Sequence, residues 1–232
     1  MLIAIHKTLM DNNIELEKYK VSPIDDGTEI KNGMNKIERF IKRAFDFLFS
    51  GILIIIFSPL YIACYIAVKR EDGGPAIYRQ ERIGYKGKKF NILKFRSMRM
   101  DAEKDGPQLF DATTGEDKRL TKIGKFLRAH HLDELPQLMN VFKGDMSFIG
   151  PRPEREYFIE KIMEADKRYR YLYQIRPGVT SFATLYNGYT DTLEKMLTRL
   201  YYDLYYLQHG SLTQDLSILW RTFRGIVVGK KF

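Results

Sequence analysis

The chain has 232 residues and a formal net charge of +9 at pH 7, with 38 Lys and Arg against 29 Asp and Glu. This length is sufficient for one catalytic domain with a membrane-associated element, and it does not clearly provide for two domains. The single cysteine excludes an intramolecular disulfide, and the four histidines show no spacing typical of a zinc site. The positive charge is compatible with phosphorylated substrates, anionic lipid headgroups or nucleic acid.

Residues 1–33 are expected to form a flexible N-terminal tail. The first ten residues contain an apolar patch that is too short for the core of a signal peptide, and no small-residue cleavage site follows it. The rest of the tail mixes charged residues with Asn, Pro and Gly, a composition typical of poorly ordered or loosely docked segments.

An apolar run of about 22 residues occupies positions 47–68. It is long enough to cross the ~30 Å hydrocarbon core of a bilayer as one straight helix. Ser58 and Pro59 lie at its middle, and proline bends or breaks a helix because it lacks an N–H group and clashes with the preceding turn. The Ser58 hydroxyl is a local partner for the carbonyl group that proline leaves free.

Basic residues flank this run on both sides. They are Lys36, Arg39, Lys42 and Arg43 before it and Lys69 and Arg70 after it. Because positive residues prefer the cytoplasmic side, a straight span would force one flank outward, whereas a helix–break–helix hairpin keeps both inside. The pattern alone leaves a spanning helix and a re-entrant hairpin equally open.

A strand pair is predicted next, with residues 76–78 and 90–92 on either side of a turn-rich segment at 84–87. The polar stretch 101–117 is predicted to begin as a helix and to continue as a loop. Farther along, residues 157–171 are predicted to form a charged surface helix, and 176–178 form a turn.

Two amphipathic helices are predicted near the C-terminus. The first has an apolar stripe at helical spacing, Leu193, Met196, Leu197, Leu200, Tyr201 and Leu204, which favours packing against a core. The second has the stripe Leu216, Leu219, Trp220, Phe223, Ile226 and Val227, with Arg221, Arg224, Lys230 and Lys231 around it. Trp and Phe on one face suit a helix in the membrane interface, but core packing explains the second stripe equally well.

Residues 128–153, RAHHLDELPQLMNVFKGDMSFIGPRP, carry the densest chemistry of the chain. Asp133 and Glu134 precede Pro136 and a stretch of helical apolar spacing, so Asp133 is expected at or near a helix N-cap. Unpaired N–H groups and the helix dipole favour an ionised carboxylate there and also attract phosphate. A plain helix cap is nevertheless the commoner role for such a pair.

The segment DELPQLMNVFKGDMSFIGPRP resembles the signature of the bacterial sugar transferases, the monotopic phosphoglycosyl transferase family. The likeness extends to KRAFDFLFS at 42–50, SPL at 58–60, GGPAIYRQERIG at 73–84, KFRSM at 94–98, RPGVTS at 176–181 and YYDLYYL at 201–207. It covers the chain from residue 36 to the C-terminus. Such enzymes transfer a phosphosugar from a nucleotide diphosphate sugar, here expected to be a UDP-sugar, to a polyprenyl phosphate.

The resemblance implies an α+β fold and a monotopic membrane protein. Its parts would be a re-entrant membrane element at 34–72, with the break at Ser58 and Pro59, and a cytosolic catalytic region at 73–232 with a small β-hairpin or sheet and amphipathic interfacial helices. The two parts would form one functional domain. The expected location is the bacterial cytoplasmic membrane, with the catalytic face in the cytosol and a role in starting surface glycan assembly.

The same resemblance assigns roles to particular residues. Asp133 would be the nucleophile that forms a covalent aspartyl-phosphosugar and would also be a Mg²⁺ ligand, with Glu134 as its partner. The candidate substrate and phosphate ligands are Arg128, Arg152, Arg176, Lys94, Arg96 and Asp203. Guanidinium groups bind phosphate bidentately, although an isolated arginine more often forms a surface salt bridge.

Two other classes of protein compete with this interpretation. A basic peripheral protein could bind anionic lipid without catalysis, and an inactive relative could keep the fold as an assembly partner. Intact Asp133, Glu134 and the three arginines argue against an inactive relative. Nucleic acid binding is disfavoured because the aromatic residues follow helical apolar stripes and no DNA- or RNA-binding motif occurs.

Overall fold

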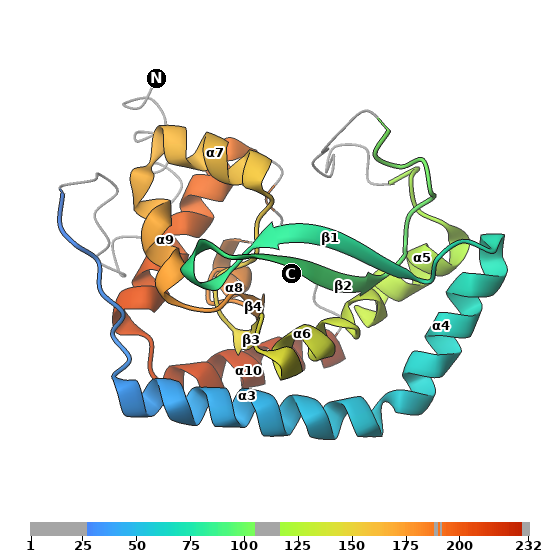
Figure 1. Ribbon diagram of the computed structural model, residues 1–232, viewed down its shortest axis with the longest axis horizontal. Coiled ribbons are helices and arrows are strands. Elements are labelled where there is room, and N and C mark those ends of the chain that lie inside the picture. The colour runs from blue at the N-terminus through green and yellow to red at the C-terminus, as the bar shows by residue number, and fades with distance from the viewer. Residues whose placement is uncertain (1–26, 105–116, 188–189, 191, 229–232) are drawn as a thin grey trace.

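The computed structural model describes residues 27–104, 117–187, 190 and 192–228. Within these ranges the chain has a mixed α+β fold with two small sheets, as expected. Most of the predicted tail at 1–33, most of the polar stretch 101–117, and Lys230 and Lys231 lie outside the described residues. Figure 1 shows one long helix along an edge of the molecule, with the sheets and the remaining helices above it.

That long helix is α3 (Lys36–Ile56), and it is followed directly by α4 (Ser58–Asp72). α3 begins at a capping box, in which the Asn35 side chain accepts hydrogen bonds from the N–H groups of Ile37 and Glu38. Among the described residues no single helix is both long and apolar enough to cross a bilayer, but α3 and α4 together meet the requirement, with a bend of 65° between them.

The predicted break at Ser58 and Pro59 is confirmed. Phe57 separates the two helices, and Pro59 occupies the first turn of α4. A proline at this position cannot donate to Ile55, four residues earlier. The Ser58 hydroxyl donates to the Ile55 carbonyl oxygen instead, at 2.8 Å, so the expected compensation is also present.

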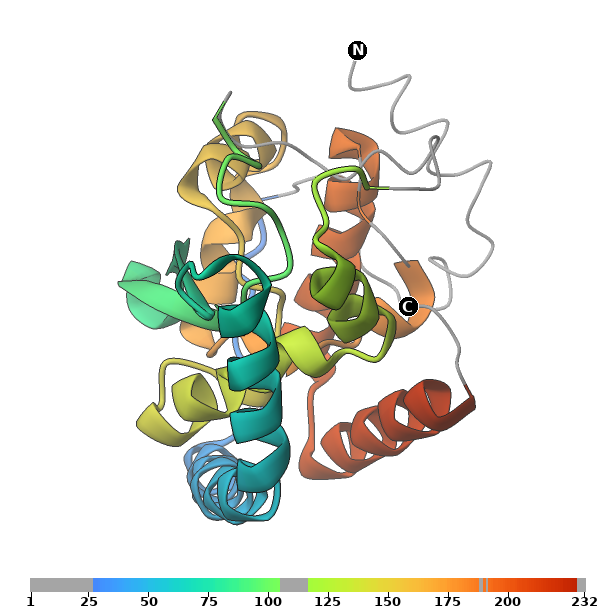
Figure 2. The ribbon, with the colours of Figure 1, turned by 90° about the vertical axis from the view of Figure 1, so that its right-hand side faces the viewer.

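The bent pair leaves a large apolar surface uncovered. Its exposed side chains are Ile37, Phe40, Ile41, Phe45, Phe47, Leu48, Ile52, Ile55, Ile56, Phe57, Ile62, Tyr65 and Ile66. Exposed apolar patches of this kind mark sites of interaction with membranes or proteins. Figure 2 shows α10 (Leu212–Val228) beside α3 at the same edge of the molecule.

The predicted strand pair is confirmed and is longer than the sequence suggested. β1 (Ile77–Ile83) and β2 (Lys89–Phe95) are antiparallel, and their register places Tyr78 opposite Lys94. The connection turns at Lys86 and Gly87, which both have positive φ. At its far end, β2 leads into Arg96, whose guanidinium pairs with Asp72 at the end of α4.

A second sheet was not predicted. Its strands β3 (Ser147–Ile149) and β4 (Gly178–Thr180) have three residues each and run parallel, so the turn predicted at 176–178 in fact leads into a strand. The two strands lie close enough to require glycine, since a Cβ on Gly150 would come within 2.1 Å of the Arg176 carbonyl oxygen. Segments this short carry no periodicity that a sequence pattern could show.

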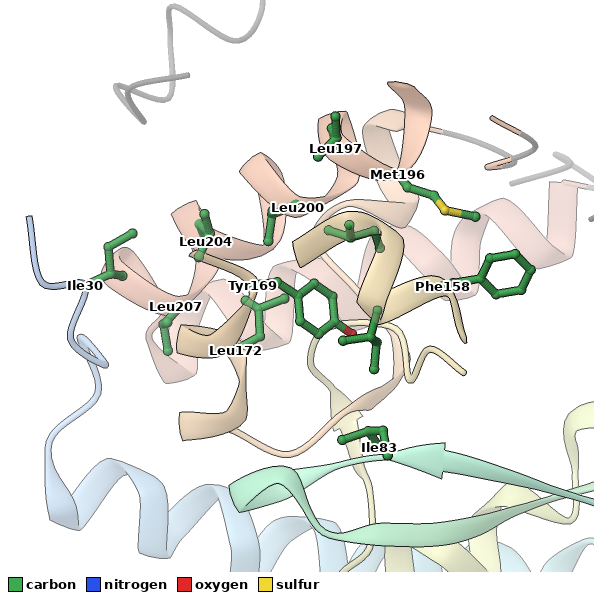
Figure 3. Close-up of a cluster of buried hydrophobic side chains, with 12 residues drawn as sticks. Ile30, Ile83, Phe158, Tyr169, Leu172, Met196, Leu197, Leu200, Leu204 and Leu207 are labelled. Carbon is green, nitrogen blue, oxygen red and sulfur yellow. The ribbon is translucent and has the colours of Figure 1, made fainter. Parts of the chain in front are cut away.

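The charged surface helix predicted at 157–171 is wrong in part. The region consists of α7 (Glu156–Ala165) and a 3₁₀ helix, η3 (Lys167–Gln174), separated by Asp166, whose side chain caps η3. Both pack their apolar side chains into a buried cluster with α9 (Leu193–His209), while charged side chains such as Glu160 and Lys161 are exposed on the other face of α7 (Figure 3). The cluster comprises Ile30, Ile83, Phe158, Ile159, Ile162, Tyr169, Leu172, Met196, Leu197, Leu200, Leu204 and Leu207.

The two C-terminal helices use their apolar stripes differently. The stripe of α9 faces the core, as predicted, apart from the partly exposed Leu193 at its start. On α10 the side chains of Leu216, Trp220 and Phe223 are each at least 60 % exposed, so core packing does not account for them. Leu219, by contrast, packs against a buried cluster.

Candidate active site

Asp133 and Glu134 lie in a short 3₁₀ turn, η2 (Leu132–Glu134), between α5 (Lys122–Ala129) and α6 (Gln137–Lys143). The expectation that Asp133 caps the following helix is wrong, because Pro136 occupies the position before α6. The turn is entered through His131, a non-glycine residue with φ 55°. Non-glycine residues in this region are uncommon and concentrate at functional sites.

The environment of Asp133 also differs from the expected one. Its side chain is buried, and it forms no hydrogen bond or ion pair with a described residue. Burial raises the pKa of Asp133, and the neighbouring Glu134 carboxylate raises it further, whereas Lys94, Arg128 and His131 act in the opposite direction. The structure therefore does not show a helix end holding this pKa down. It shows a buried carboxyl group whose pKa is raised by desolvation and lowered in part by nearby cations.

Glu134 has the opposite character. Its Oε1 atom lies 2.6 Å from the Nζ atom of Lys94 on β2. Burial on its own raises the pKa of Glu134, but the charges of Lys94 and Arg152 and the hydrogen bond from Lys94 outweigh burial and lower the pKa to about 2. Two adjacent carboxyl groups are thus driven apart in acidity, an arrangement that often marks acid–base or nucleophilic sites.

Arg152 is the second candidate that the structure brings to this dyad. It is exposed, acts electrostatically on Glu134, and forms no hydrogen bond or ion pair with a described residue. Its backbone, in contrast, is held on both sides. The Pro151 carbonyl oxygen accepts from the N–H of Gly178 at 2.9 Å, and the Pro153 carbonyl oxygen accepts from Arg82 at 3.0 Å.

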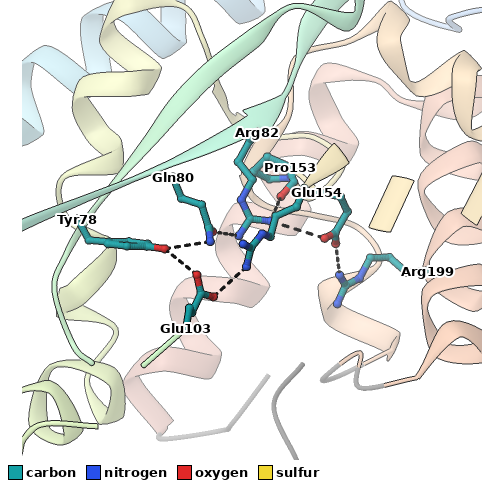
Figure 4. A network of polar contacts seen from close by, with 8 residues as sticks. Tyr78, Gln80, Arg82, Glu103, Pro153, Glu154 and Arg199 are labelled. Atoms are coloured by element: carbon teal, nitrogen blue, oxygen red, sulfur yellow. Dashed lines mark hydrogen bonds and ion pairs between the residues drawn. The ribbon is translucent and has the colours of Figure 1, made fainter. Parts of the chain in front are cut away.

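A polar network extends this support across the face of β1 (Figure 4). The Glu154 carboxylate accepts a hydrogen bond from Arg199 of α9 at 2.9 Å and forms an ion pair with Arg82 at 3.7 Å. Arg82 also contacts Gln80, which donates to the Tyr78 hydroxyl at 3.0 Å. The loop that carries Arg152 is therefore fixed by buried charges, while the guanidinium of Arg152 has no hydrogen-bond or ion-pair partner among the described residues.

Arg128 and Lys94 complete the group near the dyad. Arg128 is half-exposed at the end of α5, where its Nε donates to the Ser97 hydroxyl at 3.2 Å. It also pairs loosely with Asp117 at 3.6 Å. Both cations act on Asp133, so the described site contains Asp133, Glu134, Lys94, Arg128 and Arg152.

The three other sequence candidates are not part of this group. Arg96 is buried and engaged with Asp72, an ion pair that fastens α4 to β2. Arg176 donates from Nε to the Gly144 carbonyl oxygen at 2.8 Å, beyond the far end of α6. Asp203 is buried in α9, where it lines a small cavity with Arg152 and Arg199, and its Oδ1 atom has no hydrogen-bond partner among the described residues.

Sequence reasoning missed the supporting charges Arg82, Glu154 and Arg199. The sequence does contain a pattern that indicates one of them, Arg199. Arg199 and Asp203 are four residues apart and fall within the apolar stripe of α9, where a charged pair is unusual and indicates a buried polar contact. Burial raises the pKa of Asp203 to about 8, although Arg199 opposes this shift.

The donor set near the dyad is compatible with Mg²⁺. No group of three or more His, Cys, Asp or Glu side chains converges anywhere in the part of the chain that is described. Mg²⁺, however, commonly uses one or two carboxylates and completes its shell with water and substrate phosphates. The Asp133 oxygens have no described hydrogen-bond partner, so Asp133 fits this role, whereas Glu134 is engaged by Lys94.

Comparison with known proteins agrees with the family resemblance seen in the sequence motifs. The family model described as "Bacterial sugar transferase" matches residues 37–229. The chain is 40 % identical over 193 residues to a UDP-N-acetylgalactosamine-undecaprenyl-phosphate N-acetylgalactosaminephosphotransferase of Aeromonas hydrophila, covering 83 % of this chain and 45 % of that protein. It is 38 % identical over 222 residues to a UDP-glucose:undecaprenyl-phosphate glucose-1-phosphate transferase of Klebsiella pneumoniae, covering 94 % of this chain and 46 % of that protein.

A relative of similar name from Caulobacter vibrioides is 42 % identical over 187 residues, which is 78 % of this chain and 67 % of the relative. The chain therefore spans a little under half the length of the first two relatives and about two thirds of the third. In each case the match includes most of this chain.

Proposed function

Because this chain belongs to the bacterial sugar transferase family, we propose that it transfers a sugar 1-phosphate from a UDP-sugar to undecaprenyl phosphate and releases UMP. This reaction would start the assembly of a surface polysaccharide. The observation that carries the proposal is the dyad itself. Two adjacent carboxyl groups with pKa values shifted in opposite directions lie near the guanidinium of Arg152, which forms no ion pair with a described residue, within the region that matches the family.

Asp133 is the proposed nucleophile. An Asp133 carboxylate oxygen attacks the phosphorus next to the sugar, the P–O bond to UMP breaks, and the chain carries an aspartyl-phosphosugar. A phosphate oxygen of the lipid acceptor then attacks the same phosphorus and expels Asp133, which restores the carboxylate. The Asp133 side chain is buried, and its oxygens accept no hydrogen bond from a described residue. Both features suit it to act as a nucleophile, because they leave its lone pairs available for the attack.

The cations around the dyad have separate proposed roles. Lys94 holds Glu134 ionised and in place through the 2.6 Å contact. Arg152 and Arg128 would bind the substrate phosphates, on which negative charge develops as the leaving group departs. Arg152 is better suited to this role than Arg128, which already contacts Ser97 and Asp117.

Mg²⁺ is the proposed cofactor, held by Asp133 and the substrate phosphates. When bound, it would neutralise charge on the phosphoryl oxygens. Chelation should therefore abolish the release of UMP, and added Mg²⁺ should restore it. Full activity in excess chelator would contradict this part of the proposal.

The bent pair α3–α4 is the proposed membrane element, entering and leaving the bilayer on the cytoplasmic side of the bacterial inner membrane. Three observations support this: the 65° bend, the basic residues at both flanks, and the exposed apolar surface of the pair. The exposed stripe of α10 would lie in the same interface. Phe49 and Leu53 of α3 pack against a buried cluster that includes β3 and α9 residues, so residues 34–72 and 73–232 would act as one functional domain.

The test is to incubate the purified chain, in detergent with Mg²⁺, with a panel of labelled UDP-sugars and no lipid acceptor. One substrate should release UMP in a burst, and mass spectrometry should find the phosphosugar on Asp133. Asp133→Asn should lose both the burst and the adduct, because an amide is a poor nucleophile. An active Asp133→Asn variant, with no adduct on the parent chain, would exclude the covalent mechanism.

A further inference from the structure

A cavity of about 230 Å³ lies apart from the dyad, between the first half of α3, β3 and the start of β4. Its wall contains the cations Arg39, Lys42, Arg43 and Arg176 and the carboxylate of Asp46. The volume is smaller than the roughly 300–1,000 Å³ typical of sites for drug-sized ligands, and suits a compact polar group.

The positive charge in this cavity is only partly compensated. Lys42 is paired with Asp215 at 2.5 Å, and Asp46 accepts from the N–H of Phe148 at 3.1 Å. Neither Arg39 nor Arg176 forms an ion pair with a described residue. Taking these pairs together, the lining retains more cationic than anionic groups, and a partly buried excess of positive charge favours binding of an anion.

Arg43 and Arg176 approach each other at the C-terminal end of α6. Arg43 donates to the carbonyl oxygens of Val141 and Phe142 at 2.7 and 2.8 Å, and Arg176 donates from Nε to Gly144 at 2.8 Å. The two like charges repel each other. The terminal amino groups of Arg176 form no hydrogen bond with a described residue, and its guanidinium lies over the ring of Tyr85 at 5.0 Å. The two terminal amino groups of Arg176 can therefore donate to a ligand, and stacking on Tyr85 fixes the plane in which they lie.

Asn32 provides an independent sign of a missing acceptor. Its Oδ1 atom accepts from the N–H of Met34 at 3.0 Å, which fixes the orientation of the amide. Asn32 is one of the residues that line the cavity, and its buried Nδ2 atom has no hydrogen-bond partner among the described residues. A buried donor without an acceptor is costly, and an oxyanion would satisfy both this donor and the arginines.

The position of the cavity separates it from the proposed chemistry. The dyad precedes the N-terminal end of α6, whereas Arg43 and Arg176 contact its C-terminal end. A helix of 7 residues is about 10 Å long, so one phosphate cannot contact both places. Arg39 is exposed and lies on the same face of α3 as Lys42 and Arg43, three and four residues farther along the helix.

We propose that this cavity binds a phosphate group, carried by a phospholipid headgroup or present as the free anion, at a site distinct from the catalytic dyad. Arg39, Arg176 and Asn32 are its ligands. The headgroup is favoured because α3 belongs to the proposed membrane element, which would place its first turns near the level of the lipid headgroups. The bound anion would brace the start of α3 against β3 and β4.

The test measures binding to the full chain carrying Arg128→Ala and Arg152→Ala, which removes the proposed phosphate ligands at the dyad, so that phosphate at the dyad and failure of the transferase reaction do not affect the result. Native mass spectrometry from detergent would count retained phosphatidylglycerol in the presence of equimolar phosphatidylcholine. One phosphatidylglycerol per chain is expected. Arg39→Glu should weaken its retention about tenfold or more, the loss of one charge-assisted contact, and Asn32→Ala should weaken it less.

Arg79→Glu is the matched control, because Arg79 is also exposed, makes no ion pair with a described residue, and lies on β1 away from the cavity. A second titration uses inorganic phosphate and follows the melting temperature. Stabilisation by phosphate that Arg39→Glu abolishes would identify the free anion as sufficient, whereas retention of lipid alone would identify the headgroup. Equal retention by Arg39→Glu and the parent, or an equal loss in Arg79→Glu, would overturn the proposal.

Discussion

Lys94 and Glu134 are joined by a 2.6 Å contact that makes two neighbouring carboxyl groups chemically unequal. Glu134 receives the ammonium group directly and has its pKa lowered to about 2, whereas buried Asp133 has its pKa raised. Lys94 lies on β2 of the hairpin, opposite Tyr78 of β1. β2 therefore supplies one of the positive charges that make the pKa values of Asp133 and Glu134 differ. A sheet residue distant in sequence therefore contributes to the difference between the pKa values of the two acidic residues.

Replacing Lys94 should shift the pH dependence of the reaction. The proposed nucleophile must be ionised, so the rate should rise as pH increases through the raised pKa of Asp133. Lys94→Met removes a cation that lowers this pKa, so the acid limb of the kcat/KM profile should move to higher pH. Lys89→Met, which removes an exposed lysine that pairs with Glu156, is the control. An unchanged acid limb in Lys94→Met would show that this contact does not govern the dyad.

Glu154 should act through Arg152 rather than on the substrate. Arg152→Ala is expected to lower kcat/KM roughly 10²-fold, as for the loss of one charge-stabilising donor. Glu154→Gln should lower it less, roughly tenfold, because the ion pairs that fix the loop are weakened. The double variant should resemble Arg152→Ala alone, since Glu154 has nothing left to position.

Steady-state kinetics of the four proteins would measure this coupling. Glu156→Gln is the matched control, because Glu156 is exposed and pairs only with Lys89 among the described residues. If the effects of Arg152→Ala and Glu154→Gln simply multiply, Glu154 does not position Arg152.

Asp203 should weaken the fold as pH rises. Its pKa of about 8 means that the folded chain holds the proton more tightly than the unfolded chain, in which the ordinary value is 3.8. Stability contributed by this proton is therefore complete below pH 4 and falls as pH increases toward 8. Asp203→Asn keeps the shape without the charge, so it should raise the melting temperature by several degrees at pH 8 and by less at pH 5. In a chain of this size each kcal/mol corresponds to roughly 2–4 °C.

Thermal unfolding in detergent at the two pH values would test this expectation. The exposed carboxylate Glu160 offers a control, and Glu160→Gln should leave both temperatures nearly unchanged. A gain in Asp203→Asn that is the same at pH 5 and pH 8 would mean that Asp203 is not protonated in the folded chain.

The sequence predicted the elements whose pattern is local. The break at Ser58 and Pro59, the strand pair and the apolar stripe of α9 all rest on periodicity or on the geometry of proline. The short strands β3 and β4 could not be predicted, because they are defined by their contact across 30 residues of chain and by two glycines that allow it. The region 157–171 was placed on the surface because its charges dominate the pattern, although Arg168 and Asp166 bury theirs against each other.

In the candidate site too, neighbouring residues were predicted from the sequence more readily than residues from distant segments. The dyad and Arg152 belong to one segment and were predicted together. Lys94 of β2 was predicted only through its motif, and Arg199 of α9 was missed. Arg176 was grouped with them by its motif, but α6 separates it from the dyad. The pKa of Asp133 was predicted in the wrong direction because burial of the turn, which no local pattern reports, outweighs the helix end.

The last prediction concerns the membrane. Both ends of the pair α3–α4 should lie on the cytoplasmic side, because both flanks are basic and the chain bends by 65° at Phe57. In a Cys64→Ala chain, Lys36→Cys and Arg70→Cys place one thiol at each end, and both positions are exposed. A membrane-impermeant maleimide should label both thiols in inverted vesicles and neither in right-side-out vesicles.

Pro59→Leu provides the matched perturbation. A leucine restores the N–H that can donate to Ile55, so the Ser58 hydroxyl is no longer needed and a continuous apolar helix becomes favourable. The ion pair between Arg96 and Asp72 opposes this change, because it holds the end of α4 to β2 on the catalytic side. We therefore expect Pro59→Leu alone to move only part of the position-70 label to the outer face, and Pro59→Leu with Arg96→Ala to move more. Labels on opposite faces in the chain with Pro59 intact would exclude the re-entrant arrangement.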